Sequence, residues 1–342
     1  GNLEVTSATC TENGYITITC TRCNRVFQSG VDAEADKYLE DYPFFDLTAK
    51  GHKYEAVVTA PTFDAEGYTT HTCSVCGASY TDSYTDKLTV GATVNGERYE
   101  NITDAVAGAA DGDTIKLEAD VDEATAVVVD KNLTIDLNGK NVTVTEDTVG
   151  DGVFHVVAGG ELTINGEGTV NGLGNNPWCM VIWADGGKVV INGGTYTNVG
   201  ATDPDDGTHF DVIYVKNGGI VEINGGKFEC QTPQWTINNH DKLPGTIIVK
   251  GGEFVGFDPS NTATEPAGAN NNFVADGYDV VENNGVYTVV AHVHVEGATV
   301  VENEVAATCT ADGSYDTVVY CTACGEELSR VTTTVDALGH KY

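Results

Sequence analysis

Basic residues and long apolar runs are scarce in this chain. Its 342 residues include 17 lysines and arginines against 51 aspartates and glutamates, which gives a formal net charge of -34. A surface this negative repels phosphate backbones and anionic headgroups, so we expect neither nucleic-acid binding nor membrane-surface binding. No stretch of 18 apolar residues occurs, which predicts that no segment inserts into a membrane.

Arginine is especially rare, and the start of the given sequence bears on where an export signal would lie. The four arginines are Arg22, Arg25, Arg98 and Arg330. No basic and apolar segment opens the sequence at Gly1, so we expect any export signal to lie outside it or to have been removed. We also expect the sequence to be part of a longer multi-domain chain.

Five short apolar runs in the middle of the chain each end in a polar residue and a glycine. These glycines lie at positions 139, 166, 193, 225 and 251, at intervals of 27, 27, 32 and 26 residues. Apolar and polar residues alternate before the turns, as at Val189, Ile191, Val221 and Ile223, and no helical period of 3.6 fits. The pattern predicts a mainly β fold, a parallel β-helix whose coils stack one strand at a time.

The repeat also predicts which side chains face inward. Residues 101–110 suit a short helix that covers the first coil. Aligned on the repeated glycine, three aromatic residues form a column that we interpret as internal packing: Tyr196, Phe228 and Phe254. The same alignment gives a column of Phe154, Val181 and Ile213 beside one of His155, Ile182 and Tyr214, and we expect the second to face solvent. Cys179 and Cys230 differ in register and are expected to be buried thiols rather than a bonded pair.

Eight of the ten cysteines lie outside the repeat, in three units of similar order. Each unit has an Ala-Thr-Cys-Thr or related segment, then a glycine and a tyrosine, then a Cys-x-x-Cys turn. The cysteines are Cys10, Cys20 and Cys23 in the first unit, Cys73 and Cys76 in the second, and Cys309, Cys321 and Cys324 in the third. Phe63 replaces the first cysteine of the second unit. A Gly-His-Lys-Tyr tetrapeptide recurs at 51–54 and 339–342.

Three thiols and one imidazole suit a tetrahedral zinc site. The Cys-x-x-Cys turn directs two sulfurs to one point, and its backbone amides soften their charge. The expected fourth ligands are His52 for the first unit, His52 or His71 for the second, and His340, His292 or His294 for the third. Protein atoms fill every ligand position, so we expect the zinc to be structural. The alternatives are disulfides of an exported protein or free thiols, and for the second unit a site without metal.

These residues resemble two known families. The Ala-Thr-Cys-Thr segment, the Cys-x-x-Cys-Gly turn and the Gly-His-Lys-Tyr close resemble cysteine-rich repeats of exported proteins of gut Firmicutes. The central stretch, with Val94-Asn95-Gly96, Tyr99 and 112–117, is similar to right-handed parallel β-helices of the pectate-lyase-like superfamily. The resemblance implies a secreted or cell-surface protein of a Gram-positive bacterium. The predicted domains are knuckle units 1–54 and 55–88, a right-handed β-helix at 89–291, and a third knuckle unit at 292–342.

Coils lengthen at one corner, at residues 173–178, 201–210 and 232–241. Loops on a rigid scaffold often carry binding sites, and tryptophans beside carboxylates suit sugar rings and hydroxyls. Ordinary turn composition is the alternative interpretation. Acidic side chains at this corner could also hold calcium. The candidate residues for binding a glycan or host surface component are Trp178, His209, Asp211, Tyr214, Trp235 and His240.

The favoured function is a non-catalytic spacer or adhesin module. The alternative is a carbohydrate-active enzyme, a polysaccharide lyase or glycoside hydrolase, with Asp205, Asp206 and His209 as candidate catalytic residues. Lyases of the superfamily pair calcium-binding acids with a basic residue, but no arginine lies in any coil after Arg98. The Gly-His-Gly and Arg-x-Lys motifs of the related hydrolases are also missing, so we favour a non-catalytic role.

Overall fold

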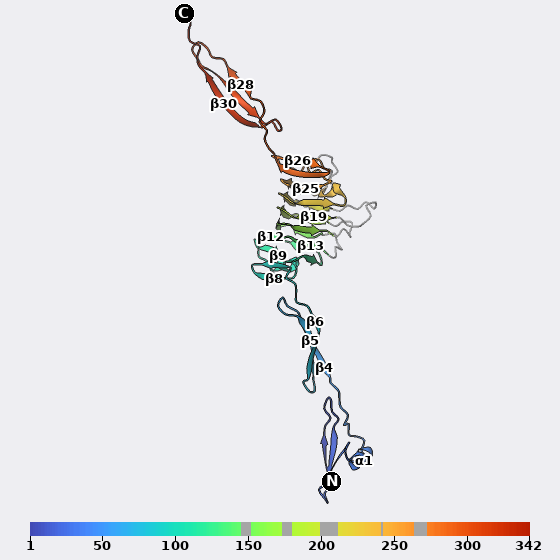
Figure 1. Ribbon diagram of the computed structural model, residues 1–342. Coiled ribbons are helices and arrows are strands. Elements are labelled where there is room, and N and C mark those ends of the chain that lie inside the picture. The colour runs from blue at the N-terminus through green and yellow to red at the C-terminus, as the bar shows by residue number, and fades with distance from the viewer. Residues whose placement is uncertain (145–151, 173–179, 199–210, 241, 263–271) are drawn as a thin grey trace. The chain divides into compact units, whose positions relative to one another are not determined.

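The computed structural model describes residues 1–144, 152–172, 180–198, 211–240, 242–262 and 272–342 (Figure 1). The chain forms two compact units, Gly1–Val90 and Gly91–Tyr342. The fold is mainly β, as predicted, with a parallel β-solenoid and small antiparallel sheets. In the described part of the chain, no helix is both long and apolar enough to cross a bilayer.

The first unit contains two antiparallel three-stranded sheets. Its first sheet is built from β1 (Asn2–Thr6), β2 (Tyr15–Thr19) and β3 (Val26–Gln28), with helix α1 (Ala33–Asp41) after it. Its second sheet is built from β4 (Tyr54–Thr59), β5 (Gly67–Cys73) and β6 (Ser79–Thr85). Every residue of β4 is exposed, so this sheet has almost no apolar core of its own.

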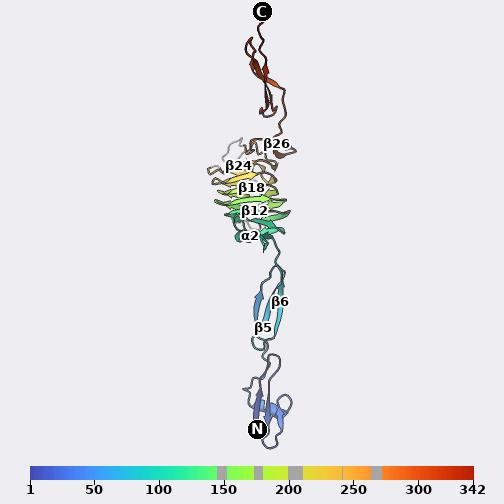
Figure 2. The same cartoon turned by 90° about the vertical axis from the view of Figure 1, so that its left-hand side faces the viewer.

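Three parallel sheets form the solenoid in the second unit (Figure 2). Each coil adds one strand to each sheet, except that the last coil adds β24 and β25 alone. The first sheet holds β9 (Thr114–Leu117), β12 (Asn132–Asp136), β15 (Glu161–Asn165), β18 (Lys188–Ile191), β21 (Ile220–Ile223) and β24 (Thr246–Val249). The second holds β10 (Val121–Glu123), β13 (Lys140–Val144), β16 (Gly168–Asn171), β19 (Thr195–Asn198), β22 (Lys227–Cys230) and β25 (Gly252–Val255). The third holds β11 (Val127–Val129), β14 (Phe154–Val157), β17 (Met180–Asp185), β20 (Asp211–Lys216) and β23 (Ile237–Asn239).

The alternation seen in the sequence places one row of side chains inside the solenoid. Val189 pairs with Val221 and Ile191 with Ile223 in the parallel register, and all four are fully buried. The predicted aromatic column is also internal. Tyr196 stacks on Phe228 with 5.1 Å between ring centroids, and Phe228 stacks on Phe254 at 4.9 Å. All three rings are fully buried, which confirms their role in core packing.

The asparagines before the repeated glycines form a ladder on the surface. Asn192 Nδ2 donates to Asn165 Oδ1 at 2.7 Å, and Asn224 Nδ2 donates to Asn192 Oδ1 at 2.9 Å. The glycines that follow Asn192 and Asn224 lie against the backbone of the coil before, where a Cβ at Gly193 or Gly225 would approach a carbonyl oxygen at 2.9 Å. The Asn-Gly pair therefore supplies both a lateral hydrogen bond and a close approach between coils.

The predicted cap covers the first coil. Helix α2 (Ile102–Gly108) begins after Asn101, whose side chain accepts a hydrogen bond from the Asp104 backbone at 2.7 Å, as an N-cap does. Its buried residues are Ile102, Ala105 and Val106. Strand β7 (Ala92–Val94) pairs antiparallel with β9, and β8 (Glu97–Tyr99) pairs antiparallel with β7. At the other end, β26 (Tyr278–Asn283) and β27 (Val286–Ala291) form a hairpin that extends the second sheet beyond β25.

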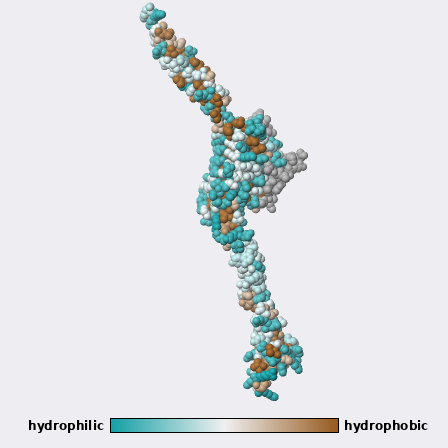
Figure 3. Space-filling model, viewed as in Figure 1, coloured by the Kyte–Doolittle hydropathy of each residue, from teal (hydrophilic) through white to brown (hydrophobic). Residues whose placement is uncertain are grey.

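A third antiparallel sheet follows the solenoid. Its strands are β28 (Val300–Val305), β29 (Gly313–Tyr320) and β30 (Glu327–Val335). Arg330 bridges Asp316, Glu302 and Glu327 at 2.6–3.0 Å. Hydrophobic surface is visible on this sheet in Figure 3, and Val301 and Val331 are both more than half exposed. Within its strands only Gly313, Asp316 and Val318 are buried, so this sheet, like the sheet of β4, has little apolar core of its own.

Candidate metal centres and an outward column of rings

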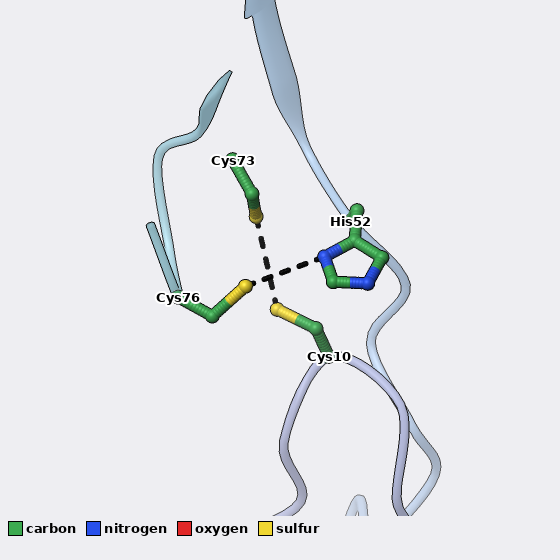
Figure 4. Close-up of side chains that lie close together, drawn as sticks. All are labelled: Cys10, His52, Cys73 and Cys76. Atoms are coloured by element: carbon green, nitrogen blue, oxygen red, sulfur yellow. Dashed lines mark hydrogen bonds between the residues drawn. The ribbon is translucent and has the colours of Figure 1, made fainter. Parts of the chain in front are cut away.

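Four side chains of the first unit converge on one point. Cys10 comes from the loop between β1 and β2, and His52 lies just before β4. Cys73 is the last residue of β5, and Cys76 lies in the turn between β5 and β6. Their ligand atoms all lie within 4.8 Å of one another, and Figure 4 shows the four side chains directed toward a common centre. We refer to this set as the first Cys/His group.

The spacing of the first Cys/His group fits tetrahedral coordination. Zinc binds thiolate sulfur at about 2.3 Å and imidazole nitrogen at about 2.0–2.1 Å, so two sulfurs of one tetrahedron lie about 3.8 Å apart. The Sγ atoms of Cys10 and Cys73 are 3.8 Å apart. His52 Nδ1 lies 3.3 Å from Cys76 Sγ. A disulfide would instead bring two sulfurs to about 2.05 Å. The group could therefore hold a metal ion.

The backbone of the Cys-x-x-Cys turn prepares one sulfur to be a ligand. Hydrogen bonds from the backbone amides of Cys76 and Val75, together with His52, lower the pKa of Cys73 to about 5. Burial and the two neighbouring thiols raise the pKa of Cys10 to about 11. A thiolate is the form that binds metal, so metal binding at this group displaces the proton of Cys10.

A second Cys/His group lies between the solenoid and the last sheet. It consists of His292, His294, Cys321 and Cys324, whose ligand atoms also lie within 4.8 Å of one another. His292 Nε2 is 3.6 Å from Cys321 Sγ, and His294 Nδ1 is 3.6 Å from Cys324 Sγ. A sulfur and a nitrogen of one tetrahedral zinc site are about 3.6 Å apart. This group therefore also fits a metal ion, with two thiols and two imidazoles.

Carboxylates contact the far nitrogens of both histidines in the second group. His292 Nδ1 lies 2.6 Å from Asp279 Oδ2 in β26, and His294 Nε2 lies 3.6 Å from Glu326 Oε2. The Cys321 sulfur and then Asp279 raise the pKa of His292. Metal-ligating histidines usually donate their second ring nitrogen to a carboxylate or carbonyl in this way. The arrangement fixes the ring orientation and leaves Nε2 of His292 to face the sulfurs.

The sequence predicted most of these ligands but not their grouping. Cys10 and His52 join the turn of the second unit, not Cys20 and Cys23 of their own. In the third unit, Cys321 and Cys324 meet His292 and His294, while Cys309 and His340 are not in the group. The reason is geometric, because the Ala-Thr-Cys loop and the Cys-x-x-Cys turn lie at opposite ends of a three-stranded sheet. The sequence did contain a signal for this grouping. The second unit lacks its own first cysteine, so a four-ligand site there needs a ligand from another unit.

His71, a candidate ligand of the second unit, has another role. Its Nε2 lies 2.9 Å from Asp82 Oδ1, and its ring stacks on Tyr80 with 4.7 Å between centroids. The cysteines of the three knuckle units all carry free thiols, namely Cys10, Cys20, Cys23, Cys73, Cys76, Cys309, Cys321 and Cys324. Cys230 is buried as expected, and burial raises its pKa to about 12.

A column of rings follows the outer face of the third solenoid sheet. His155 of β14 stacks on Trp183 of β17, with 4.1 Å between centroids and 2° between planes. Tyr214 of β20 lies 6.2–6.3 Å from Trp183 and from His240. We call these four residues the ring column. His155 Nε2 also lies 3.4 Å from Asp185 Oδ2. These four rings are partly exposed, but the Nε1 atom of Trp183 is buried and has no hydrogen-bond partner among the described residues.

The predicted outward column is confirmed for His155 and Tyr214 but is wrong for Ile182, the residue predicted to lie between them. Ile182 pairs with Phe154 and is fully buried, whereas Trp183 pairs with His155 and Tyr214. The turn after β17 is one residue shorter than the turn after β20, because Asp185 pairs with Lys216 while Lys188 pairs with Ile220. Counting back from the Asn-Gly corner therefore shifts the register of β17 by one residue, which exchanges the two faces.

The other candidate binding residues have different surroundings. Asp211 opens β20 and is buried, with its Oδ2 accepting from Asn238 Nδ2 at 3.2 Å. It therefore does not belong to an exposed acidic surface. Trp235 lies in a short 3₁₀ helix, η2 (Pro233–Trp235), and β23 follows it within what the sequence indicated as a loop. Trp178, Cys179, Asp205, Asp206 and His209 lie outside the described residues.

Comparisons with known proteins give no relative. No family model, no curated protein and no solved structure matches the chain.

Proposed function

We propose that the chain is a non-catalytic module of a secreted or cell-surface bacterial protein, in which zinc-stapled units carry a glycan-binding β-helix. The observation that carries this proposal is the pair of four-ligand Cys/His groups. Each group supplies four protein ligands, so a bound tetrahedral ion has no open position for a substrate. Such an ion stabilises structure, and the units that it stabilises are suited to spacing and presenting the solenoid.

Two features support an exported location and a β-helix of the pectate-lyase-like type. The net charge of -34 favours solubility in a medium rich in cations. The three parallel sheets with a cap helix at the first coil agree with the superfamily that the sequence resembles. A Gram-positive origin follows from the resemblance of the cysteine-rich repeats.

The ring column supports the glycan-binding part of the proposal. Its strands β17 and β20 directly follow two of the three predicted corner insertions. The stacked rings of Trp183 and His155 and the ring of Tyr214 are partly exposed at this surface. Asp185, which contacts His155 and accepts from Asn217, adds a carboxylate at the same surface. Rings with adjacent carboxylates and amides can pack against a sugar and bond to its hydroxyls.

Metal analysis of the purified chain tests the structural part. Under reducing conditions we expect two zinc ions per chain and no disulfides. A metal content of zero with no titratable thiols in the knuckle units would contradict the zinc assignment and favour disulfides.

A glycan array with the parent chain and a Trp183→Ala variant tests the binding part. We expect binding of at least one glycan class by the parent and a loss of at least tenfold in affinity by the variant. Phe44→Ala, at an exposed ring of the first unit, is the control and should bind like the parent. A parallel assay for reducing sugars and unsaturated products on uronic polymers addresses the enzyme alternative. Turnover by the parent would overturn the non-catalytic role.

A further inference from the structure

Two ligand pairs of the cysteine-rich units lie outside both Cys/His groups. One is the turn with Cys20 and Cys23 between β2 and β3. The other is Cys309 in the loop between β28 and β29, with His340 beyond β30. Cys23, Cys309 and His340 are exposed and Cys20 is half-buried, so all four are accessible to a partner.

The Cys309 loop has the backbone geometry of the Cys10 loop. The amide of Gly51, next to His52, donates to the carbonyl of Cys10 at 3.0 Å. In the same way, the amide of Gly339, next to His340, donates to the carbonyl of Cys309 at 3.1 Å. The preceding threonines match as well, since Thr9 and Thr308 each accept a backbone hydrogen bond at 2.9 Å from the residue three positions later. Cys309 and His340 therefore form half of a site like the first Cys/His group.

The turn with Cys20 and Cys23 supplies the matching half. The amide of Cys20 donates to the carbonyl of Arg25 at 2.8 Å, as the amide of Cys73 does to the carbonyl of Ala78. A left-handed residue closes both turns, with φ of 55° at Asn24 and 74° at Gly77. The two turns thus share the conformation that directs both sulfurs of Cys73 and Cys76 to their group.

We propose that Cys309 and His340 of one copy and Cys20 and Cys23 of a second copy of this chain bind one zinc ion together. The ligand set is then three thiolates and one imidazole, the same as in the first Cys/His group. In that group, too, the Cys and His of one three-stranded unit meet the Cys-x-x-Cys turn of another. Because the two halves differ, the contact is head to tail, which predicts an assembly that adds copies either as an open chain or as a closed ring. The inference rests on zinc as the ion proposed above.

The test follows the mass of the full chain with added zinc under reducing conditions, by light scattering after size exclusion. We expect the mass to rise with protein concentration, the zinc content to rise above two toward three per chain, and a chelator to reverse both. Two variants block one end each, Cys309→Ser with His340→Ala, and Cys20→Ser with Cys23→Ser. Each variant alone should remain a monomer with two zinc ions.

An equimolar mixture of the two variants gives the sharpest result. One open pair remains on each partner, so the mixture should form a dimer and nothing larger. Tyr342→Ala is the matched control, because Tyr342 is fully exposed beside His340 yet is no ligand, and it should assemble like the parent.

Other outcomes would overturn the inference. These are a parent that stays monomeric with two or three zinc ions, an assembly that needs no zinc, and blocked variants that still assemble. A parent chain that binds fewer than two zinc ions would instead contradict the proposed structural metal sites, so the two failures can be told apart.

Discussion

The solenoid and the three-stranded sheets use similar strands but differ in what stabilises them. In the solenoid, Val189, Ile191 and their partners in the next coil are fully buried, and the aromatic column adds large buried rings. In the sheet of β4, β5 and β6, only Gly67 and Cys73 are buried. Strand pairing is common to both regions, but a continuous apolar core is confined to the solenoid. The stabilisation that we propose for the small sheets is instead metal binding at their Cys/His groups.

Removal of a ligand from the first Cys/His group should have the largest effect. Structural zinc contributes on the order of 10 kcal/mol to the folding of small zinc-dependent units. His52→Gln should therefore lower the zinc content by one ion and abolish the hydrogen-exchange protection of β4–β6, while the solenoid strands stay protected. His71→Gln is the control, because His71 bonds to Asp82 outside the group. Equal loss of protection in both variants would show that the sheet does not depend on the metal.

A cavity in the solenoid core should produce the opposite pattern. Phe228 is fully buried between Tyr196 and Phe254, and a buried Phe→Ala change costs about 3–5 kcal/mol. Phe228→Ala should lower the unfolding free energy of the solenoid in denaturant titrations and leave the zinc content unchanged. Phe44→Ala, at a ring that is 72% exposed, is the control. Zinc release by Phe228→Ala would indicate that the two kinds of region are not independent.

Acid should reveal the polar network that supports the last sheet. Hydrogen bonds from Asn303, Thr332 and Arg330 lower the pKa of Asp316 to about 2. A depressed carboxyl pKa stabilises the fold above the ordinary value near 3.8, and that stability is lost as the pH falls toward 2. A carboxyl NMR titration should place the Asp316 midpoint near 2. Arg330→Met should move the midpoint upward, whereas an unchanged midpoint would contradict the role of Arg330.

The asparagine ladder should give the smallest effect. A hydrogen bond contributes about 0.5–1.5 kcal/mol, and exposed bonds lie at the low end. Asn192→Ala removes two ladder bonds, and Asn165→Ala removes one. We expect the loss of unfolding free energy for Asn192→Ala to be about twice that for Asn165→Ala. Equal losses would indicate that the ladder bonds do not add independently.

The coils were predictable because their signal is local. Alternation before each Asn-Gly turn is a property of neighbouring residues, and it gave the buried faces of β18 and β21 and the inner aromatic column. The register of β17 was missed because one residue is absent from the turn after Asp185, which a count from the glycine cannot detect.

The pairing of Cys10 with Cys73 was missed for another reason. It joins residues 63 positions apart across two repeats, and ligand types alone do not say which repeat completes which site.

The contact between Asp279 and His292 has a consequence for how the second unit unfolds. Asp279 belongs to the hairpin that ends the solenoid, while His292 belongs to the second Cys/His group. An ion that binds only the folded group stabilises the state in which His292 keeps its orientation. It therefore also stabilises the contacts that this orientation requires. Opening of the β26–β27 hairpin is then thermodynamically linked to metal release. With the ion bound, the final hairpin of the solenoid would belong to the same cooperative transition as the cysteine-rich turn.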